Sequence, residues 1–244
     1  MRFRITVAYD GTAYGGWQIQ PNALTVQEQV ERTLHTLCGV RPKVHGSGRT
    51  DQGVHALGQV LHADLDRPFI PAALAKGMNA LLPTDIRVMG CVRAPDEFHA
   101  RRSAVWKEYR YFIWNGPVLP PHLRLYRTHC VRPLNVAAMR RAAALLVGRH
   151  DFSALTANPN RIVESTVREL TRLDVRKKGH ECVIIARSEG FLYKMVRSLA
   201  GLLIRIGEGA LPPESAQRIL ESRTRTATVP TAPPQGLFLW RVGY

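Results

Sequence analysis

The stretch Gly46-Ser47-Gly48-Arg49-Thr50-Asp51-Gln52-Gly53-Val54-His55 holds three glycines within eight residues. Glycine weakens helix and strand interiors, so the stretch predicts a tight loop whose backbone can approach a ligand closely. One carboxylate, Asp51, stands in its middle, between Arg49 and His55. An aspartate in such a loop commonly only bonds its own backbone in a turn. The spacing alone leaves Asp51 as either a turn residue or a catalytic carboxylate.

Hydrophobic periodicity predicts regular elements on both sides of this loop. The predicted elements are a strand over 2–9, a helix from the capping box Thr25-Val26-Gln27-Glu28 to a stop at Gly39, a strand near 42–46, a strand over 59–65, a helix from Pro71 to Ala80 and a strand over 86–92. This βαββαβ order is the ferredoxin-like split unit, and the glycine loop joins its second and third strands.

The same order of elements recurs in the second half. The predicted elements there are a strand over 106–114, a helix that Asn135 caps and Gly148 ends, a loop over 148–161, strands over 166–176 and 182–188 joined near Gly179, a helix over 191–206, a short helix from Pro212 and a strand over 236–244. We therefore expect a mixed α/β (α+β) chain with two ferredoxin-like halves, 1–103 and 104–244. A largely antiparallel sheet would continue across them, with a central cleft as the favoured ligand site.

Charge is the most informative property of the composition. The 244 residues include 34 Lys and Arg against 19 Asp and Glu, which gives a net charge of +15. This excess is typical of a polyanion partner, above all a nucleic acid, although a basic protein without such a partner is the simpler interpretation. No apolar run is long enough for a membrane helix. The four scattered cysteines indicate free thiols in a reducing cytoplasm.

Several kinds of chemistry lack their motif in this sequence. There is no phosphate loop of the G-x-x-x-x-G-K-[ST] type, no G-x-S-x-G nucleophile elbow, and no histidine or cysteine spacing typical of a metal site. What remains is one aspartate in a basic and aromatic setting. A single carboxylate can act as nucleophile or general base if it is ionised and aimed, and a neighbouring guanidinium would favour the ionised form.

Six sequence blocks, in order, resemble the tRNA pseudouridine synthase A family. The blocks are Tyr9-Asp10-Gly11-Thr12-x-Tyr14-x-Gly16-Trp17-Gln18, Gly48-Arg49-Thr50-Asp51-x-Gly53-Val54-His55-Ala56, Phe98-His99-Ala100-Arg101, Lys107-x-Tyr109-x-Tyr111, Met195-Val196-Arg197 and Gly236-Leu237-x-Leu239. Gln52 and Arg102 depart from the family pattern, and residues 150–182 match it weakly.

The resemblance implies isomerisation of uridine to pseudouridine in the tRNA anticodon stem-loop, at positions 38, 39 and 40, with no cofactor and no metal. It makes Asp51 the nucleophile or base, Arg197 its basic partner, and Tyr109 the side chain that stacks on the target base. Without the resemblance, Tyr109 is interpreted equally well as an aromatic residue of the core, and Arg197 as an arginine on a helix surface.

The remaining assignments concern RNA contacts and assembly. Arg49 and His55 are expected to contact RNA or to hold the loop, and Arg101, with Arg102 and Lys107, to contact phosphates. The resemblance implies a cytoplasmic homodimer with tRNA across both subunits. Two alternatives stay open: a non-catalytic RNA-binding protein, and a pseudouridine synthase acting on other RNA sites. The first leaves Asp51 unexplained, because a carboxylate in a phosphate-binding cleft repels the ligand.

Overall fold

The computed structural model describes residues 1–157 and 164–244. Two compact units are formed, one by Met1–Val105 together with Phe238–Tyr244 and the other by Trp106–Leu237. The last strand of the chain therefore belongs with the first unit, which a single boundary between residues 103 and 104 does not describe. Residues 158–161 of the predicted loop lie outside the described residues.

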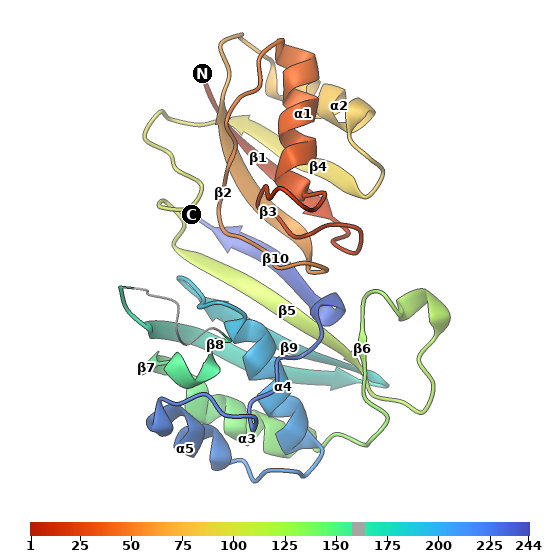
Figure 1. The fold of residues 1–244 in the computed structure, drawn as a ribbon, viewed down its shortest axis with the longest axis vertical. Helices are drawn as coiled ribbons and strands as arrows, with labels where there is room; N and C mark the ends of the chain where they lie inside the picture. The colour runs from red at the N-terminus through yellow and green to blue at the C-terminus, as the bar shows by residue number, and fades with distance from the viewer. Residues whose placement is uncertain (158–163) are drawn as a thin grey trace. The chain divides into compact units, whose positions relative to one another are not determined.

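The first unit contains five strands of one sheet and two helices (Figure 1). Its elements are β1 (Arg2–Tyr9), α1 (Val26–Cys38), β2 (His45–Gly46), β3 (His55–Asp64), α2 (Pro71–Leu81), β4 (Ile86–Arg93) and β10 (Leu237–Gly243). The strand order is β4-β1-β3-β10, and β2 pairs with another part of β3. The pairs β1–β4, β1–β3 and β2–β3 are antiparallel. This confirms the predicted split βαββαβ unit and the predicted position of the glycine loop.

The core of the first unit rests on the alternation along β1. Phe3, Ile5 and Val7 are fully buried, while the residues between them are half-buried. Burying each such side chain contributes about 1.5–3 kcal/mol relative to leaving it exposed. The intervening side chains of β1, starting with Arg2 and Arg4, lie on the opposite face of the sheet, because successive strand residues point to opposite sides.

The predicted capping box at the start of α1 is wrong. Within the described part of the chain, the Thr25 hydroxyl is buried and has no hydrogen-bond partner. The first amide groups of the helix are instead satisfied by the preceding loop: Val26 N–H donates to Gly16 O at 3.2 Å and Gln27 N–H to Trp17 O at 3.0 Å. Packing of that loop against the helix end thus replaces the side-chain cap. Gly39 ends α1 in the left-handed region at φ 81°, as predicted.

In its described residues, the second unit combines five strands, four of them in antiparallel order, with three α-helices (Figure 1). Its elements are β5 (Trp106–Trp114), β6 (Thr128–His129), α3 (Val136–Leu146), β7 (Gly148–Asp151), β8 (Val167–Lys178), β9 (Glu181–Ser188), α4 (Met195–Gly207), α5 (Ser215–Ser222) and short 3-10 helices at Pro121–Leu123, Ser153–Leu155 and Pro234–Gly236. The strand order is β5-β9-β8-β7, and β6 pairs in parallel with β5. Asn135 caps α3 as predicted, with its side-chain oxygen accepting from Ala138 N–H at 3.0 Å.

Three predicted features of the second unit need correction. Gly148 does not open a loop but begins β7, which pairs with β8 although its polar residues show no alternation. The helix expected from residue 191 begins at Met195, because Lys194 is left-handed at φ 55° and interrupts it. The helix expected from Pro212 begins at Ser215. No helix in residues 1–157 or 164–244 is long and apolar enough to cross a membrane.

Candidate active site

Asp51 lies in a tight turn of the loop between β2 and β3. Val54 N–H donates to Asp51 O at 3.1 Å, which closes the turn. Gly53 occupies the third position of that turn at φ 73°, where a type II turn requires positive φ and therefore favours glycine. The Asp51 side chain is half-buried. The glycine at position 53 thus serves the geometry of the turn that carries Asp51.

The loop before α1 supports the backbone next to Asp51. Trp17 N–H donates to Thr50 O at 3.1 Å, and Gly53 N–H donates to Tyr14 O at 3.4 Å. A Cβ atom on Gly16 would lie 2.5 Å from Thr50 O, closer than real contacts allow. The two loops can therefore approach this closely only because residue 16 is glycine.

Two buried polar side chains hold the loop from the sheet below it. The Tyr9 hydroxyl bonds Thr50 Oγ1 at 2.8 Å, and burial raises the pKa of Tyr9 above its usual value, so the phenol is neutral. Gln59 is fully buried: its Oε1 accepts from Ser47 Oγ at 2.7 Å and its Nε2 donates to Gly48 O at 2.9 Å. These contacts fix the residues on the N-terminal side of Asp51. The alternation of β1 predicts that Tyr9 is buried but does not identify its partner, and no local pattern marks Gln59.

His55 holds the other end of the loop. Its side chain is only 1% exposed, its Nδ1 accepts from Gly11 N–H at 3.0 Å, and the Asp10 carboxylate lies 3.1 Å from the same nitrogen. The ring stacks on Phe238 of β10 with centroids 4.6 Å apart. Of the two roles expected for His55, this burial favours loop-holding over RNA contact. Arg49 and Arg101, by contrast, are exposed.

Tyr109 and Arg197 lie in the second unit. Tyr109, on β5, is 8% exposed and meets Phe191 edge to face at 5.2 Å. Arg197, near the start of α4, donates from Nε to Ala232 O at 2.7 Å, and Ala232 N–H donates back to Arg197 O at 3.0 Å. Two reciprocal bonds thus tie Arg197 to the segment before β10.

A second arginine fastens that segment to α4. Arg225 donates to Ser198 Oγ at 2.8 Å, to Val229 O at 2.9 Å and to Thr231 Oγ1 at 2.9 Å. The segment crosses α4 at Gly201, where an added Cβ would lie 2.1 Å from Pro230 O. No sequence pattern marks Arg225, because it lies in an extended segment without periodicity. Four of the six predicted site residues belong to the first unit and two to the second.

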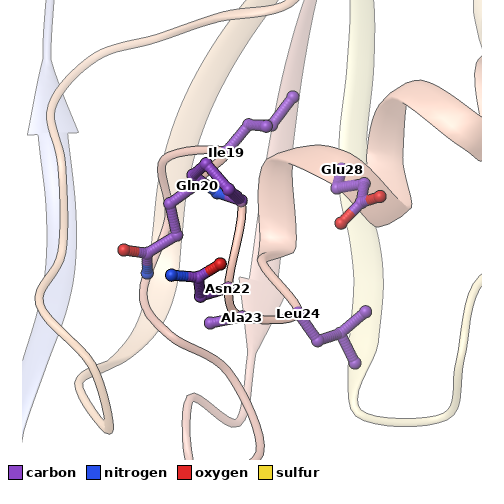
Figure 2. A pocket seen from close by; sticks show the side chains of 7 residues that line it. Ile19, Gln20, Asn22, Ala23, Leu24 and Glu28 are labelled. Atoms are coloured by element: carbon purple, nitrogen blue, oxygen red, sulfur yellow. The ribbon is translucent and has the colours of Figure 1, made fainter.

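A separate hollow lies beside the loop that precedes α1 (Figure 2). It is lined by Ile19, Gln20, Pro21, Asn22, Ala23, Leu24 and Glu28. The Gln20 side chain donates back to Gly15 O at 2.7 Å, and the only charged lining residue, Glu28, pairs with Arg32 at 2.6 Å. This lining contains none of the predicted site residues and offers little that would attract an anionic substrate.

Comparison with known proteins tests the resemblance. The profile of the family described as tRNA pseudouridine synthase matches residues 5–101 and 142–244. The chain belongs to the tRNA pseudouridine synthase family. Its reaction is the isomerisation of uridine to pseudouridine in the anticodon stem-loop of tRNA, so it is an isomerase. Asp51 and Arg197 lie in the matched ranges, whereas Tyr109 falls in the unmatched 102–141. The second matched range also includes residues 150–182.

Curated relatives extend this likeness over nearly the whole chain. The tRNA pseudouridine synthase A of Chlamydia trachomatis is 46% identical over 98% of this chain and 91% of its own length. The proteins of the same name from Rhodospirillum rubrum and Geotalea uraniireducens are 44% and 42% identical, each over 100% of this chain, and 88% and 99% of their own lengths are covered. Among solved structures, a Cbf5-Nop10-Gar1 complex matches 83% of this chain and 45% of its own at 13% identity, with a TM-score of 0.37.

Proposed function

We propose that this pseudouridine synthase works through Asp51, with Arg197 as its basic partner and Tyr109 stacking on the target uracil. The observation that carries the proposal is the support of the Asp51 turn, in which Tyr9 and Gln59 bond the loop backbone and side chains from buried positions. A buried framework of this kind holds a reacting group in one orientation, which lowers the entropic cost of reaching the transition state. A simple surface turn needs no such framework.

The reaction suits a site with one aimed carboxylate. The N1–C1′ bond breaks, the uracil turns, and a C5–C1′ bond forms, while C5 loses its proton and N1 gains one. Atoms and electrons balance within the nucleotide, so neither an oxidant nor a phosphate donor is consumed. The carboxylate of Asp51 would attack either the sugar or the uracil ring. The target base must first leave its stack in the RNA. An aromatic side chain such as Tyr109 would then stack on the extruded base and hold it in the site.

Substrate and assembly complete the proposal. The uridines converted are those at positions 38, 39 and 40 of tRNA, in the cytoplasm, by a homodimer with tRNA lying across both subunits. A net charge of +15 supports binding of a long polyanion. Light scattering on the purified protein, alone and with tRNA added, would measure the number of subunits per particle and the number of tRNA molecules bound. A monomer in both samples would contradict the dimer.

The first test is pseudouridine mapping on an unmodified tRNA transcript with wild type, Asp51→Asn and a control, Asp66→Asn, at an exposed acid of the same unit. We expect conversion at positions 38–40 by wild type and control, and none by Asp51→Asn. Affinity of Asp51→Asn for tRNA should stay within about twofold, because basic residues supply most nucleic-acid affinity. Loss of binding in step with activity would contradict the catalytic assignment. Binding without conversion by wild type would favour the RNA-binding alternative.

The second test separates catalysis from folding at Arg197. We expect Arg197→Ala to reduce kcat by at least about 100-fold, as for loss of an aimed charged group, with a small change in melting temperature. Arg205→Ala is the control, since Arg205 lies on the same helix and also donates to a backbone carbonyl, that of Thr228. A large fall in melting temperature with normal specific activity would show that Arg197 is structural.

A further inference from the structure

Three imidazoles cluster on the face of the first unit's sheet that carries Arg4. His45 of β2 stands opposite His62 of β3, and their rings stack at 4.9 Å. His99 meets His62 at 4.7 Å and His45 at 5.5 Å. The segment that carries His99 is held on the sheet, because Ala100 N–H donates to His62 Nδ1 at 3.1 Å and the Tyr244 hydroxyl donates to Ala100 O at 2.7 Å.

Positive charge surrounds this cluster. Lys43 and Arg102 are exposed, and His45 and His99 are half-buried beside them. Burial first, then the charge of Lys43, holds the pKa of His45 below its usual value; burial and then Arg102 do the same for the pKa of His99. His62, which is buried, has its pKa lowered to about 4. The facing carboxylate, Asp64, is paired with Arg2 at 2.7 Å.

The two outer histidines differ in what they can do. His99 Nδ1 accepts from the backbone N–H groups of Arg101 and Arg102 at 3.1 and 3.3 Å, so its proton sits on Nε2 and can be donated while the ring is neutral. Protonating His99 Nδ1 would break that turn. His45 is therefore the histidine able to gain a proton if an anion arrives. Residues 1–157 and 164–244 contain no group of three or more His, Cys, Asp or Glu that could hold a metal ion.

We propose that Lys43, His45, His99 and Arg102, here called the histidine patch, form a binding site for the phosphate backbone of tRNA, in which His99 donates from Nε2 and His45 takes up a proton. The proposal deepens the function above and rests on tRNA being the substrate. Charge complementarity supports this occupant: two permanent cations and two imidazoles lie together at the start of the strand that leads into the Asp51 loop. Burial is the first cause of the lowered pKa of His45, and a bound phosphate would offset the second, which is repulsion by Lys43.

The decisive experiment measures tRNA affinity against salt concentration. We expect Lys43→Gln and Arg102→Gln each to reduce the slope of log K against log salt by about 0.9, the value for one lost phosphate contact. Arg32→Gln is the matched control, because Arg32 is an exposed arginine on α1, which covers the other face of the sheet (Figure 1). It should keep the wild-type slope. Unchanged slopes in both patch variants would overturn the proposal.

Proton uptake gives an independent readout. Between pH 8 and pH 6, at constant ionic strength, wild type should gain at least about threefold more affinity than His45→Gln, since uptake of one proton allows up to tenfold per pH unit. Equal pH dependence in the two proteins would refute the role of His45. Conversion of tRNA uridine by wild type is measured in parallel. If wild type converts uridine but the salt slopes of the two patch variants are unaltered, only the role of the histidine patch is refuted. If wild type neither binds tRNA nor converts uridine, the proposed function is refuted as well.

Discussion

Replacing Gln59 by leucine tests whether the buried support of the Asp51 turn matters for catalysis. Gln59→Leu keeps a side chain of similar size but removes both hydrogen bonds to the loop, those with Ser47 Oγ and Gly48 O. Ser47 and Gln59 are fully buried, so water does not replace the bond to Ser47 Oγ in the folded protein, whereas Gly48 is half-buried. A buried polar group left unsatisfied costs about 1–3 kcal/mol. Because the bond to Gly48 O is only partly buried, the two groups together predict a loss of about 2–4 kcal/mol in the free energy of unfolding, less than the roughly 2–6 kcal/mol of two fully buried groups.

The assay combines urea unfolding with single-turnover kinetics at a temperature where the variant remains folded. We expect a lower unfolding midpoint at unchanged m-value and a rate at least about tenfold lower, because a small misplacement of a reacting group is costly. Gln217→Leu on α5 is the control, since Gln217 is exposed and bonds only Glu221 among the residues of its helix. A stability loss below about 1 kcal/mol together with a normal rate would refute the reasoning.

Three further predictions concern stability. Thr25→Val should leave the free energy of unfolding unchanged or raise it by up to about 1 kcal/mol, because the buried Thr25 hydroxyl has no partner in the described residues; a loss above that amount in urea unfolding would reveal one. Gly201→Ala should lower the melting temperature by several degrees, since its Cβ would lie 2.1 Å from Pro230 O, and an unchanged melting curve would contradict this close approach. The pKa of His62 is lowered to about 4 in the fold, so unfolding takes up a proton below pH 6.5 and stability falls from there toward pH 4. His62→Gln should flatten that part of the stability–pH curve, and an identical curve would exclude His62 as its cause.

Much of the fold follows from local sequence patterns. The alternation along residues 2–9 predicts β1 and its buried face, because one side of a strand must leave water. Gly39 and Asn135 mark helix ends, because positive φ and a side-chain oxygen satisfy local requirements of the backbone. The glycines around Asp51 likewise predict a tight turn. The six sequence blocks, which occur in the order typical of the family, then identify the family without any knowledge of the tertiary contacts.

Tertiary structure decided what local patterns do not encode. β7 exists because β8 lies beside it, although its own residues show no alternation. The first N–H groups of α1 donate to the carbonyl groups of Gly16 and Trp17 rather than to the Thr25 side chain. Packing brings the loop that contains Gly16 and Trp17 to the helix end. His55 became a buried support, and β10 joined the first unit through parallel pairing with β3. Each of these outcomes depends on groups distant in sequence that meet only after folding, so the sequence alone predicted Asp51 as the reacting carboxylate, and the folded structure determined what holds its loop.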